Sequence, residues 1–100
     1  MGPDGGTHQS IEDIALMRSL PNISIICPAD DIEARAAVIE ASKINGPFYL
    51  RMGRSSVPTF HNENYKFEFG KREILKEGKD ATIIATGLMV IEALEAAIQL

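Results

Sequence analysis

Apolar residues recur at helical spacing in three stretches of this chain, residues 11–20, 31–44 and 88–100. Side chains three and four positions apart lie on one face of a helix, so each stretch predicts a helix with an apolar side. The first helix is expected to end at Pro21, because proline lacks the N–H group that a helix interior needs. All three helices therefore need other elements to cover their apolar faces.

The starts of these helices carry different signals. Ser10 is the predicted N-cap of the first helix, since its hydroxyl can accept a hydrogen bond from the first turn. Asp30 is the predicted N-cap of the second, with Glu33 three residues on as its partner in a capping box. Thr86 and Gly87 precede the third helix. An anion can bind at such a place, but helix capping is the favoured interpretation because the spacing of phosphate-binding loops is missing.

Short runs of β-branched or large apolar residues lie between the helical stretches. Residues 23–27, 48–52 and 81–85 are typical of buried strands. Residues 66–69 alternate like an exposed strand, and residues 72–75 predict another. The order strand, helix, strand in the first half predicts a βαβ unit with parallel strands. The expected fold class is α/β: pieces of a three-layer fold with a parallel sheet, then the first strand and helix of a second α/β domain.

The chain divides into three parts at its changes of character. Residues 1–58 hold the βαβ unit, residues 59–79 form a polar connection between domains, and residues 80–100 begin a second domain. After Met1 the sequence opens inside a loop, and it stops at Leu100 without a helix stop signal. We therefore expect a segment of a larger protein, with uncovered sheet edges and apolar faces that favour dimerisation or domain exchange.

Composition narrows the function classes. The 100 residues are 45% hydrophobic and 24% charged, with a net charge of −4 and no basic cluster, which argues against nucleic acid or an anionic membrane as partner. No apolar run approaches the length needed to cross a bilayer. Cys27 is the only cysteine, so there is neither a disulfide framework nor a zinc motif. The cytoplasm is the default compartment.

The opening loop, residues 2–9, concentrates polar chemistry between glycines. Glycine permits a positive φ and a close approach of ligand to backbone. Asp4 can accept hydrogen bonds from hydroxyl groups, and His8 can donate to a developing oxyanion or carry a proton. The residue types thus suit a site for a sugar or an oxyanion. A solvated terminal loop is the alternative that composition alone leaves open.

Arg54 follows a predicted strand and a glycine, where open parallel sheets bind their ligands. Its guanidinium group suits phosphate, with a surface salt bridge as the alternative. Arg51 alternates with Tyr49 and is expected to face solvent or a partner. His61 is expected to be an exposed loop histidine, and Cys27 a small buried hydrophobe rather than a nucleophile.

Several blocks, taken in order, resemble the transketolase family of thiamine-diphosphate enzymes over the whole chain. They are Gly2-Pro3-Asp4-Gly5-Gly6-Thr7-His8-Gln9, Met17-Arg18-Ser19-Leu20-Pro21-Asn22, Pro28-Ala29-Asp30, Gly46-Pro47, Leu50-Arg51, Gly53-Arg54 and the run from Glu77 to Gly87. The first blocks resemble the end of the pyrimidine-binding domain. The last block resembles the start of the family's C-terminal domain, which mainly serves assembly.

This resemblance implies roles for three residues. Asp4 and His8 correspond to the acid and the histidine that contact the hydroxyls and the reacting oxygen of a sugar, His8 being the catalytic member, and Arg54 corresponds to the arginine that binds the sugar phosphate. Gly6 stands where proline is common in transketolases, which loosens the loop. The implied parent is a cytoplasmic enzyme of the pentose phosphate pathway that transfers a two-carbon ketol unit from a ketose phosphate to an aldose phosphate.

The resemblance also implies what the segment lacks. The glutamate and the aromatic residues that hold the cofactor's aminopyrimidine ring lie upstream in this family, and the diphosphate and metal motif lies in another domain. Thiamine diphosphate and Mg²⁺ therefore belong to the complete enzyme, with no cofactor-binding or metal-binding residue expected here. The segment alone is expected to be inactive and to need a second copy or a partner subunit.

Two other functions remain open. The deoxyxylulose-phosphate synthases and the β subunits of 2-oxo acid dehydrogenases share the domain plan, although Thr7-His8-Gln9 and Gly53-Arg54-Ser55-Ser56 favour transketolase. A non-catalytic assembly subunit is the alternative from another class, and it would use its α/β surfaces to pair with a partner.

Overall fold

A computed structural model describes residues 4–100 of the chain, and its elements follow the predicted order closely. A short 3-10 helix, η1 (Gly6–His8), precedes helix α1 (Asp13–Arg18), strand β1 (Ser24–Ile26), helix α2 (Asp31–Ala41), strand β2 (Phe48–Leu50) and helix α3 (Met89–Gln99). Part of the opening loop, residues 1–3, lies outside the described residues. The α/β class is confirmed.

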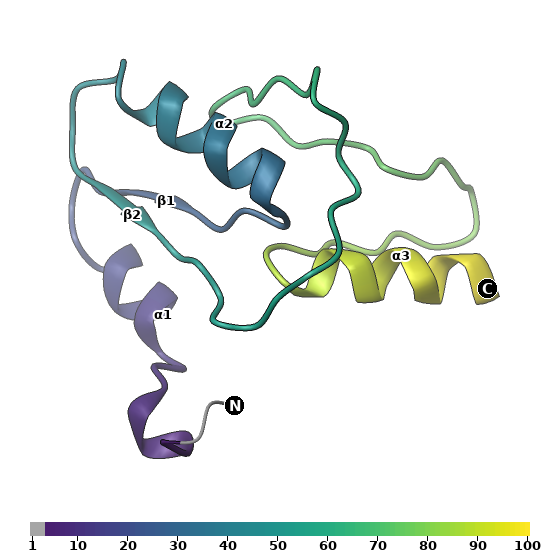
Figure 1. The fold of residues 1–100 in the computed structure, drawn as a ribbon, viewed down its shortest axis with the longest axis horizontal. Coiled ribbons are helices and arrows are strands. Elements are labelled where there is room, and N and C mark those ends of the chain that lie inside the picture. Colours follow the sequence, from purple (N-terminus) through teal and green to yellow (C-terminus); the bar gives the residue numbers. More distant parts are fainter. Residues whose placement is uncertain (1–3) are drawn as a thin grey trace.

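The two strands form the predicted parallel pair, with Ser24 opposite Phe48 and Ile26 opposite Leu50. The N–H of Arg51 donates to the carbonyl of Ile26 at 2.9 Å, which carries the pairing one residue past β2. Helix α2 connects the strands along one side of the sheet and α1 lies on the other side, so this part has three layers (Figure 1). The βαβ prediction is confirmed.

The start of α2 follows the capping prediction in all but one bond. The Glu33 N–H donates to Asp30 Oδ1 at 2.8 Å, as expected of an N-cap. The Glu33 carboxylate accepts from the Ala29 N–H at 2.7 Å, one residue earlier than in a standard capping box. The N–H groups of Ala29 and Glu33 are therefore satisfied by side chains three or four residues away.

The predicted N-cap of the first helix was wrong. Helix α1 begins at Asp13, its N-cap is Glu12, and no side chain caps it. Ser10 and Ile11 line a cleft instead. The carboxylate of Asp13 is directed to β2, where it accepts two hydrogen bonds, so tertiary contacts rather than local capping fix where this helix starts.

No helix or strand interrupts residues 51–88, which run as an extended connection from β2 to α3 (Figure 1). The strands predicted over residues 66–69, 72–75 and 81–85 were therefore wrong. A strand exists only where a neighbour accepts and donates its backbone hydrogen bonds, and β1 and β2 pair only with each other among residues 4–100. The apolar run at residues 81–85 is left largely open, with Ile84 94% exposed.

The connection is fixed onto the start of α2 by the same aspartate that caps this helix. Oδ2 of Asp30 accepts from the N–H groups of Phe60 at 3.0 Å and His61 at 2.9 Å. The prediction of an exposed loop histidine was wrong, because the His61 side chain is only 7% exposed. Its ring lies between Phe60 and Tyr65, with ring centres 4.2 and 4.1 Å away.

Two carboxylates face the His61 ring. Nδ1 lies 3.0 Å from Asp30 Oδ1, and Nε2 lies 3.2 Å from Glu73 Oε2. Burial disfavours the protonated ring, but the two carboxylates outweigh burial and raise the pKa of His61 above 6.5. Burial likewise opposes ionisation of Asp30, but hydrogen bonds from Glu33, His61 and Phe60 lower its pKa from 3.8 to about 2. The His61 ring thus lies between two acidic side chains, Asp30 at the start of α2 and Glu73 in the connection.

These shifts predict a defined pH window for this junction. The contribution of His61 is complete below its unfolded pKa of 6.5 and is lost as pH rises through the higher folded value. The contribution of Asp30 is present above 3.8 and is lost as pH falls toward about 2. We expect the His61 ring resonance of the complete gene product to titrate above pH 6.5, and E73Q to lower that midpoint. A midpoint at or below 6.5 in the unsubstituted protein would contradict the ion-pair assignment.

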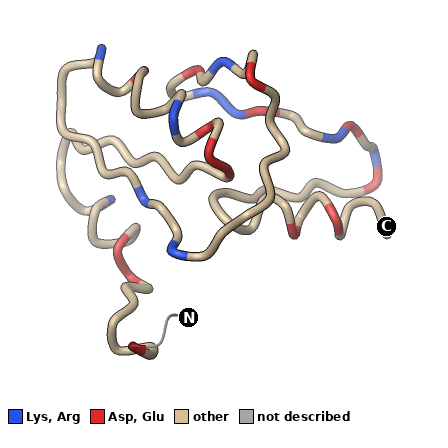
Figure 2. The backbone as a smooth tube through the Cα atoms, in the orientation of Figure 1, with Lys and Arg blue, Asp and Glu red and all other residues tan. Residues whose placement is uncertain are grey.

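The interior of the described chain is small. Ile26, Ala29 and Ala37 are its buried apolar residues, whereas large apolar side chains such as Ile11 (82% exposed) and Leu100 (93% exposed) face outward. Charges of both signs alternate along the connection, and acidic residues gather at the start of α2 (Figure 2). No helix within residues 4–100 is long and apolar enough to cross a membrane. The exposed apolar area agrees with the expectation that these faces need a covering partner.

Candidate functional site

An open cleft of about 680 Å³ lies past the carboxyl end of β2, where parallel sheets bind their ligands. Three parts of the chain meet there: the loop before α1, the residues after β2, and the start of α3. Its lining consists of Gln9, Ser10, Ile11, Asp13, Tyr49, Leu50, Arg51, Met52, Gly53, Arg54, Ser55 and Leu88. Of the three residues predicted for the site, Arg54 lines this cleft.

Asp4 lies next to Arg54 although fifty positions separate them in the sequence. The Nη1 group of Arg54 donates to Asp4 Oδ2 at 2.9 Å, and both side chains are more than half exposed. An exposed pair of this kind contributes about 1 kcal/mol or less, so an incoming anion can displace the carboxylate at little cost. The fold thus brings two of the predicted site residues together.

His8 is the last residue of η1 and is exposed. Its Nδ1 lies 3.2 Å from the hydroxyl of Thr7, which leaves Nε2 open to solvent or ligand among residues 4–100. Gly5 precedes η1 with φ 78°, in the left-handed region that glycine tolerates best. The glycines of the opening loop therefore shape the short turn that presents His8.

A buried acid that sequence reasoning missed forms the back of the cleft. Oδ2 of Asp13 accepts from the Tyr49 hydroxyl at 2.7 Å and from Arg51 Nε at 2.8 Å. The Asp13 side chain is 9% exposed, and its Oδ1 has no hydrogen-bond partner within residues 4–100. The interpretation of Arg51 as a residue facing solvent or a partner needs correction, because Asp13 binds its Nε while 37% of the side chain stays exposed.

The electrostatics of these three groups reinforce one another. Hydrogen bonds from Tyr49 and Arg51 lower the pKa of Asp13, so this acid is ionised at neutral pH. The bond to Asp13 in turn raises the pKa of Tyr49 and that of Arg51. The cluster therefore consists of a fixed carboxylate, a neutral phenol and a guanidinium held by one edge. In the sequence, Asp13 is recognisable only as an acid that suits a helix N-terminus. Its hydrogen bonds to Tyr49 and Arg51 become visible only in the folded chain.

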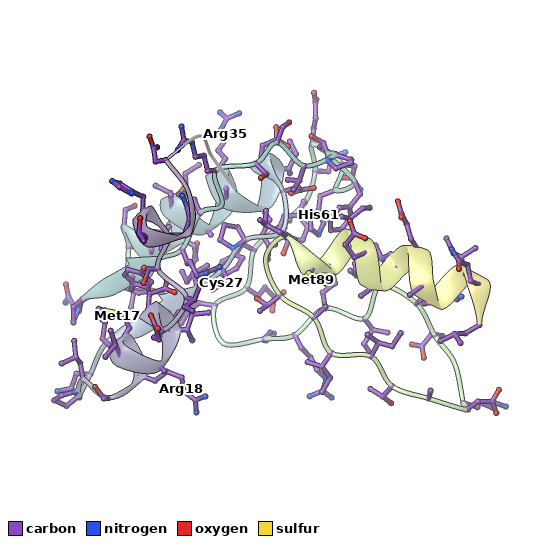
Figure 3. All side chains as sticks on the ribbon, turned by 90° about the horizontal axis from the view of Figure 1, so that it is seen from below. Met17, Arg18, Cys27, Arg35, His61 and Met89 are labelled. Atoms are coloured by element: carbon purple, nitrogen blue, oxygen red, sulfur yellow. The ribbon has the colours of Figure 1, made fainter. Side chains whose placement is uncertain are left out.

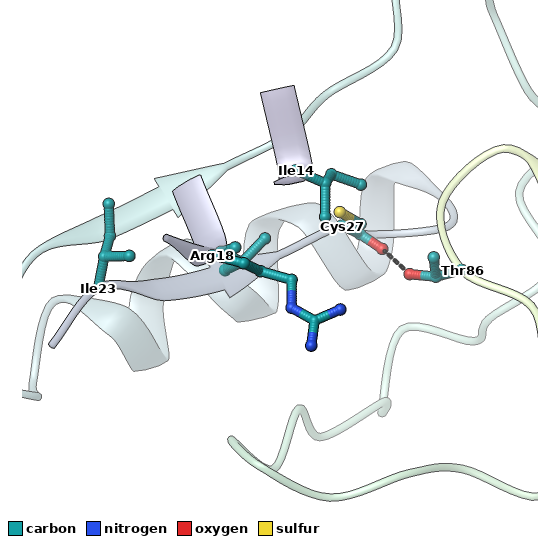
Figure 4. A pocket seen from close by; sticks show the side chains of 6 residues that line it. Ile14, Arg18, Ile23, Cys27 and Thr86 are labelled. Carbon is teal, nitrogen blue, oxygen red and sulfur yellow. Dashed lines mark hydrogen bonds between the residues drawn. The ribbon is translucent and has the colours of Figure 1, made fainter. Parts of the chain in front are cut away.

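A second cavity, of about 460 Å³, lies beside β1 and is lined by Ile14, Arg18, Ile23, Ile25, Cys27 and Thr86 (Figure 4). Burial raises the pKa of the Cys27 thiol, which keeps it protonated and weakly nucleophilic. The thiol lies near the middle of the molecule, whereas Arg35 lies at its edge (Figure 3). Cys27, predicted to be a small buried hydrophobe, is thus only half-buried and lines this cavity.

Thr86 and Gly87 do not cap α3, contrary to the favoured interpretation. The N-cap of α3 is Leu88, without a side-chain cap. The Thr86 hydroxyl and the Gly87 N–H instead donate to the carbonyl of Cys27, at 3.2 and 3.1 Å. These bonds fasten the start of α3 to the end of β1, because the Cys27 carbonyl past β1 needs donors that the two-stranded sheet does not supply.

Within residues 4–100 no three His, Cys, Asp or Glu side chains gather closely enough to hold a metal ion. The buried acids Asp13 and Asp30 both accept hydrogen bonds from other residues of this chain.

The chain is similar to several known proteins. Residues 1–59 match the family described as transketolase, pyrimidine-binding domain. A 6-deoxy-6-sulfo-D-fructose transketolase subunit from Clostridium sp. (strain MSTE9) is 43% identical over 97% of this chain and 30% of its own length. A 1-deoxy-D-xylulose-5-phosphate synthase from Lawsonia intracellularis is 43% identical over 100% of this chain and 16% of its own length.

A solved structure matches the fold closely. It is described as a split-gene transketolase in an inactive β4 tetramer, is 52% identical, and superposes with a TM-score of 0.89 over 93% of this chain and 31% of that chain. The chain thus spans about a third or less of the length of the proteins that it matches. Because the family match covers more than half of its residues, the chain belongs to the transketolase family.

Proposed function

We propose that this chain supplies the sugar-phosphate side of a transketolase that moves a two-carbon ketol unit from a ketose phosphate to an aldose phosphate. Arg54 binds the phosphate, Asp4 orients hydroxyl groups of the sugar, and His8 donates a hydrogen bond or a proton to oxygen at the reacting carbon. The observation that carries this proposal is the contact of Arg54 with Asp4, which joins the opening loop to the cleft at the end of β2.

The chemistry of each group supports its role. A guanidinium group has five N–H donors, and the bond to Asp4 uses one of them, so several remain for phosphate oxygens. The same contact places a carboxylate beside the phosphate end of the cleft, where a sugar presents hydroxyl groups as donors. His8 is exposed on a short turn, and its second ring nitrogen can reach a ligand that lies over the loop.

The remaining parts of the reaction belong to the complete protein. Thiamine diphosphate with Mg²⁺ supplies the carbanion chemistry when bound, and this chain's residues bind and orient the sugar. A second copy or a partner subunit completes the site and covers the exposed apolar faces of α1 and α3. We therefore expect a dimer or larger assembly in the cytoplasm, active in the pentose phosphate pathway, and no turnover by the 100-residue segment alone.

The test compares wild type with R54A in the complete gene product, together with any partner chain, in a ketol-transfer assay. Loss of a charged hydrogen-bonding group costs about 1.5–3 kcal/mol, so kcat/KM for the aldose phosphate is expected to fall about 10- to 100-fold, mostly through KM. H8A is expected to lower kcat while leaving assembly unchanged. R35M is the matched control, because Arg35 lies at the edge of the molecule, away from the cleft (Figure 3).

Other outcomes point to other functions. Activity of the wild type with pyruvate or another 2-oxo acid, and none with a ketose phosphate donor, would reassign the chain to the deoxyxylulose-phosphate synthase or 2-oxo acid dehydrogenase branch. The identity to a deoxyxylulose-phosphate synthase makes this the second candidate. Failure of the complete protein to bind any cofactor would favour a non-catalytic assembly subunit.

A further inference from the structure

We propose that Arg51, held by Asp13 and Tyr49, is a second guanidinium of the cleft that acts together with Arg54 on the anionic end of the substrate. This inference deepens the function proposed above and rests on it. It assigns three side chains that the comparison of motifs leaves without a role in the site.

Arg51 lies in the same cleft as Arg54. Asp13, Tyr49 and Arg51 all line the same cleft as Arg54 and Ser55, and they come from two different elements, α1 and the end of β2. Arg51 and Arg54 are separated by two residues, Met52 and Gly53, and both follow the end of β2. The first residues after β2 thus bring two guanidinium groups to one cleft.

Asp13 holds the guanidinium group of Arg51 through one of its three nitrogen atoms. Asp13 binds Nε, so both terminal nitrogen groups of the guanidinium are left for a ligand among the contacts within residues 4–100. The hydroxyl of Tyr49 bonds the same carboxylate oxygen and fixes its position. Holding a guanidinium by one edge removes much of its rotamer freedom in advance, which lowers the entropic cost of binding an anion.

Asp13 keeps one buried oxygen atom unpaired among residues 4–100. Its side chain is nine-tenths buried, yet Oδ1 has no hydrogen-bond partner within residues 4–100. Buried polar atoms are nearly always paired, and the exceptions gather at functional sites. A pair of apolar side chains of similar size would stabilise the fold at least as well as Asp13 with Arg51. We therefore assign the buried Asp13 carboxylate the role of positioning Arg51. Asp13 and Tyr49 are therefore positioning residues.

Two guanidinium groups on one cleft favour ligands with a doubly charged end. Asp4 and Asp13 each offset one arginine, but the Asp4 contact is exposed and replaceable whereas Asp13 lies behind Arg51. A phosphate that displaces Asp4 enters a cleft that both guanidinium groups line. The substrate class implied is a phosphorylated sugar in preference to its unphosphorylated counterpart, with discrimination shared between Arg51 and Arg54.

The experiment compares wild type, R51M, R51K and R35M in the complete gene product with any partner chain. Each protein is assayed with an aldose phosphate and with the unphosphorylated aldose of the same carbon number. R51M is expected to lower kcat/KM for the phosphorylated aldose about tenfold and to leave the unphosphorylated aldose within about twofold. R51K is expected to restore part of the loss, because lysine keeps the charge and loses the fork. R35M is expected to behave as wild type.

A second variant guards against misfolding. R51M leaves Asp13 buried without its cation, so the double variant D13N/R51M removes both charges while it keeps the shape of the acid. It is expected to show the same selective loss as R51M. D13N alone is expected to raise KM for the phosphorylated aldose with kcat within about twofold. An equal loss with both aldoses in the double variant would show a merely structural role and overturn the proposal.

Calorimetric titration with inorganic phosphate separates this inference from the proposed function. Wild type is expected to bind phosphate, and D13N/R51M to bind it about tenfold more weakly. Phosphate affinity that R51M and D13N/R51M leave unchanged, or no phosphate binding by wild type, overturns the two-arginine assignment even if ketol transfer is found. Weakened phosphate binding in a protein that transfers no ketol unit supports the assignment and rejects the proposed reaction.

Discussion

Replacing Asp30 with alanine is expected to free both the start of α2 and the connection that follows β2. The Asp30 side chain is fully buried, caps α2 through the Glu33 N–H, and accepts from the N–H groups of Phe60 and His61. Loss of an N-cap costs about 1 kcal/mol, and each of the two part-buried donors left without an acceptor adds about 1–3 kcal/mol. The total expected loss is at least about 3 kcal/mol, more than a hundredfold in a local opening equilibrium.

Hydrogen exchange of the complete gene product measures this effect. Peptides that cover residues 31–36 and 59–65 are expected to exchange faster together in D30A, since one side chain protects both. D31A is the matched control: Asp31 is the exposed neighbour and accepts a single hydrogen bond, from the Thr59 hydroxyl at 2.5 Å. Faster exchange in α2 alone, with residues 59–65 unchanged, would mean that Asp30 acts only as a helix cap.

Replacing Gly53 with alanine is expected to distort the cleft by driving a methyl group into Leu88. A Cβ at residue 53 would lie 2.7 Å from Cδ1 and 2.8 Å from Cδ2 of Leu88, closer than Cβ atoms approach, and 3.0 Å from Cγ, which is a tight contact. The half-buried Leu88 side chain therefore has to turn away from its present position to make room for the methyl group. Overpacking of this kind costs about 1–3 kcal/mol, and both residues line the cleft, so KM for the sugar phosphate is expected to rise as well.

A second substitution shows whether the clash is the cause. L88A in the G53A background removes the three atoms that the methyl group meets, so the double variant is expected to recover cleft function relative to G53A. G78A is the matched control, because nothing lies within 4 Å of a Cβ at that position and its φ is not in the left-handed region. Thermal unfolding measures the loss of stability, and KM for the sugar phosphate measures the distortion of the cleft. A G53A protein that equals G78A in both measurements would contradict the contact.

Local sequence determined the elements whose signals are satisfied nearby. The N-cap at Asp30, the βαβ order, the parallel pairing and the helix near the C-terminal end were predicted and are confirmed, whereas Glu33 accepts from the N–H of Ala29 instead of that of Asp30. Each depends on hydrogen bonds or spacings within about four residues, or on a chain order that leaves parallel pairing as the ordinary outcome. The sequence blocks quoted above also pointed to the transketolase family, which the family match confirms.

Tertiary structure decided everything that needs a distant partner. Residues 81–85 have the composition of a strand but no neighbour among residues 4–100, so composition could not make them one. Asp13 looks like a favourable acid at a helix start, and only the fold shows Tyr49 and Arg51 around it, more than thirty positions away. His61 looks like a loop histidine until Asp30 and Glu73 enclose it.

The candidate site divides along the same line. The sequence pointed to Asp4, His8 and Arg54 as candidate site residues, because they stand in a recognisable family pattern, and their roles stay predictions. Only the tertiary structure decided that Arg54 meets Asp4 and that a second arginine, fixed by a buried acid, lies in the same cleft. The physical reason is that side-chain type is local information, whereas charge pairing, burial and the shape of a cleft arise from contacts between segments that the chain order keeps far apart.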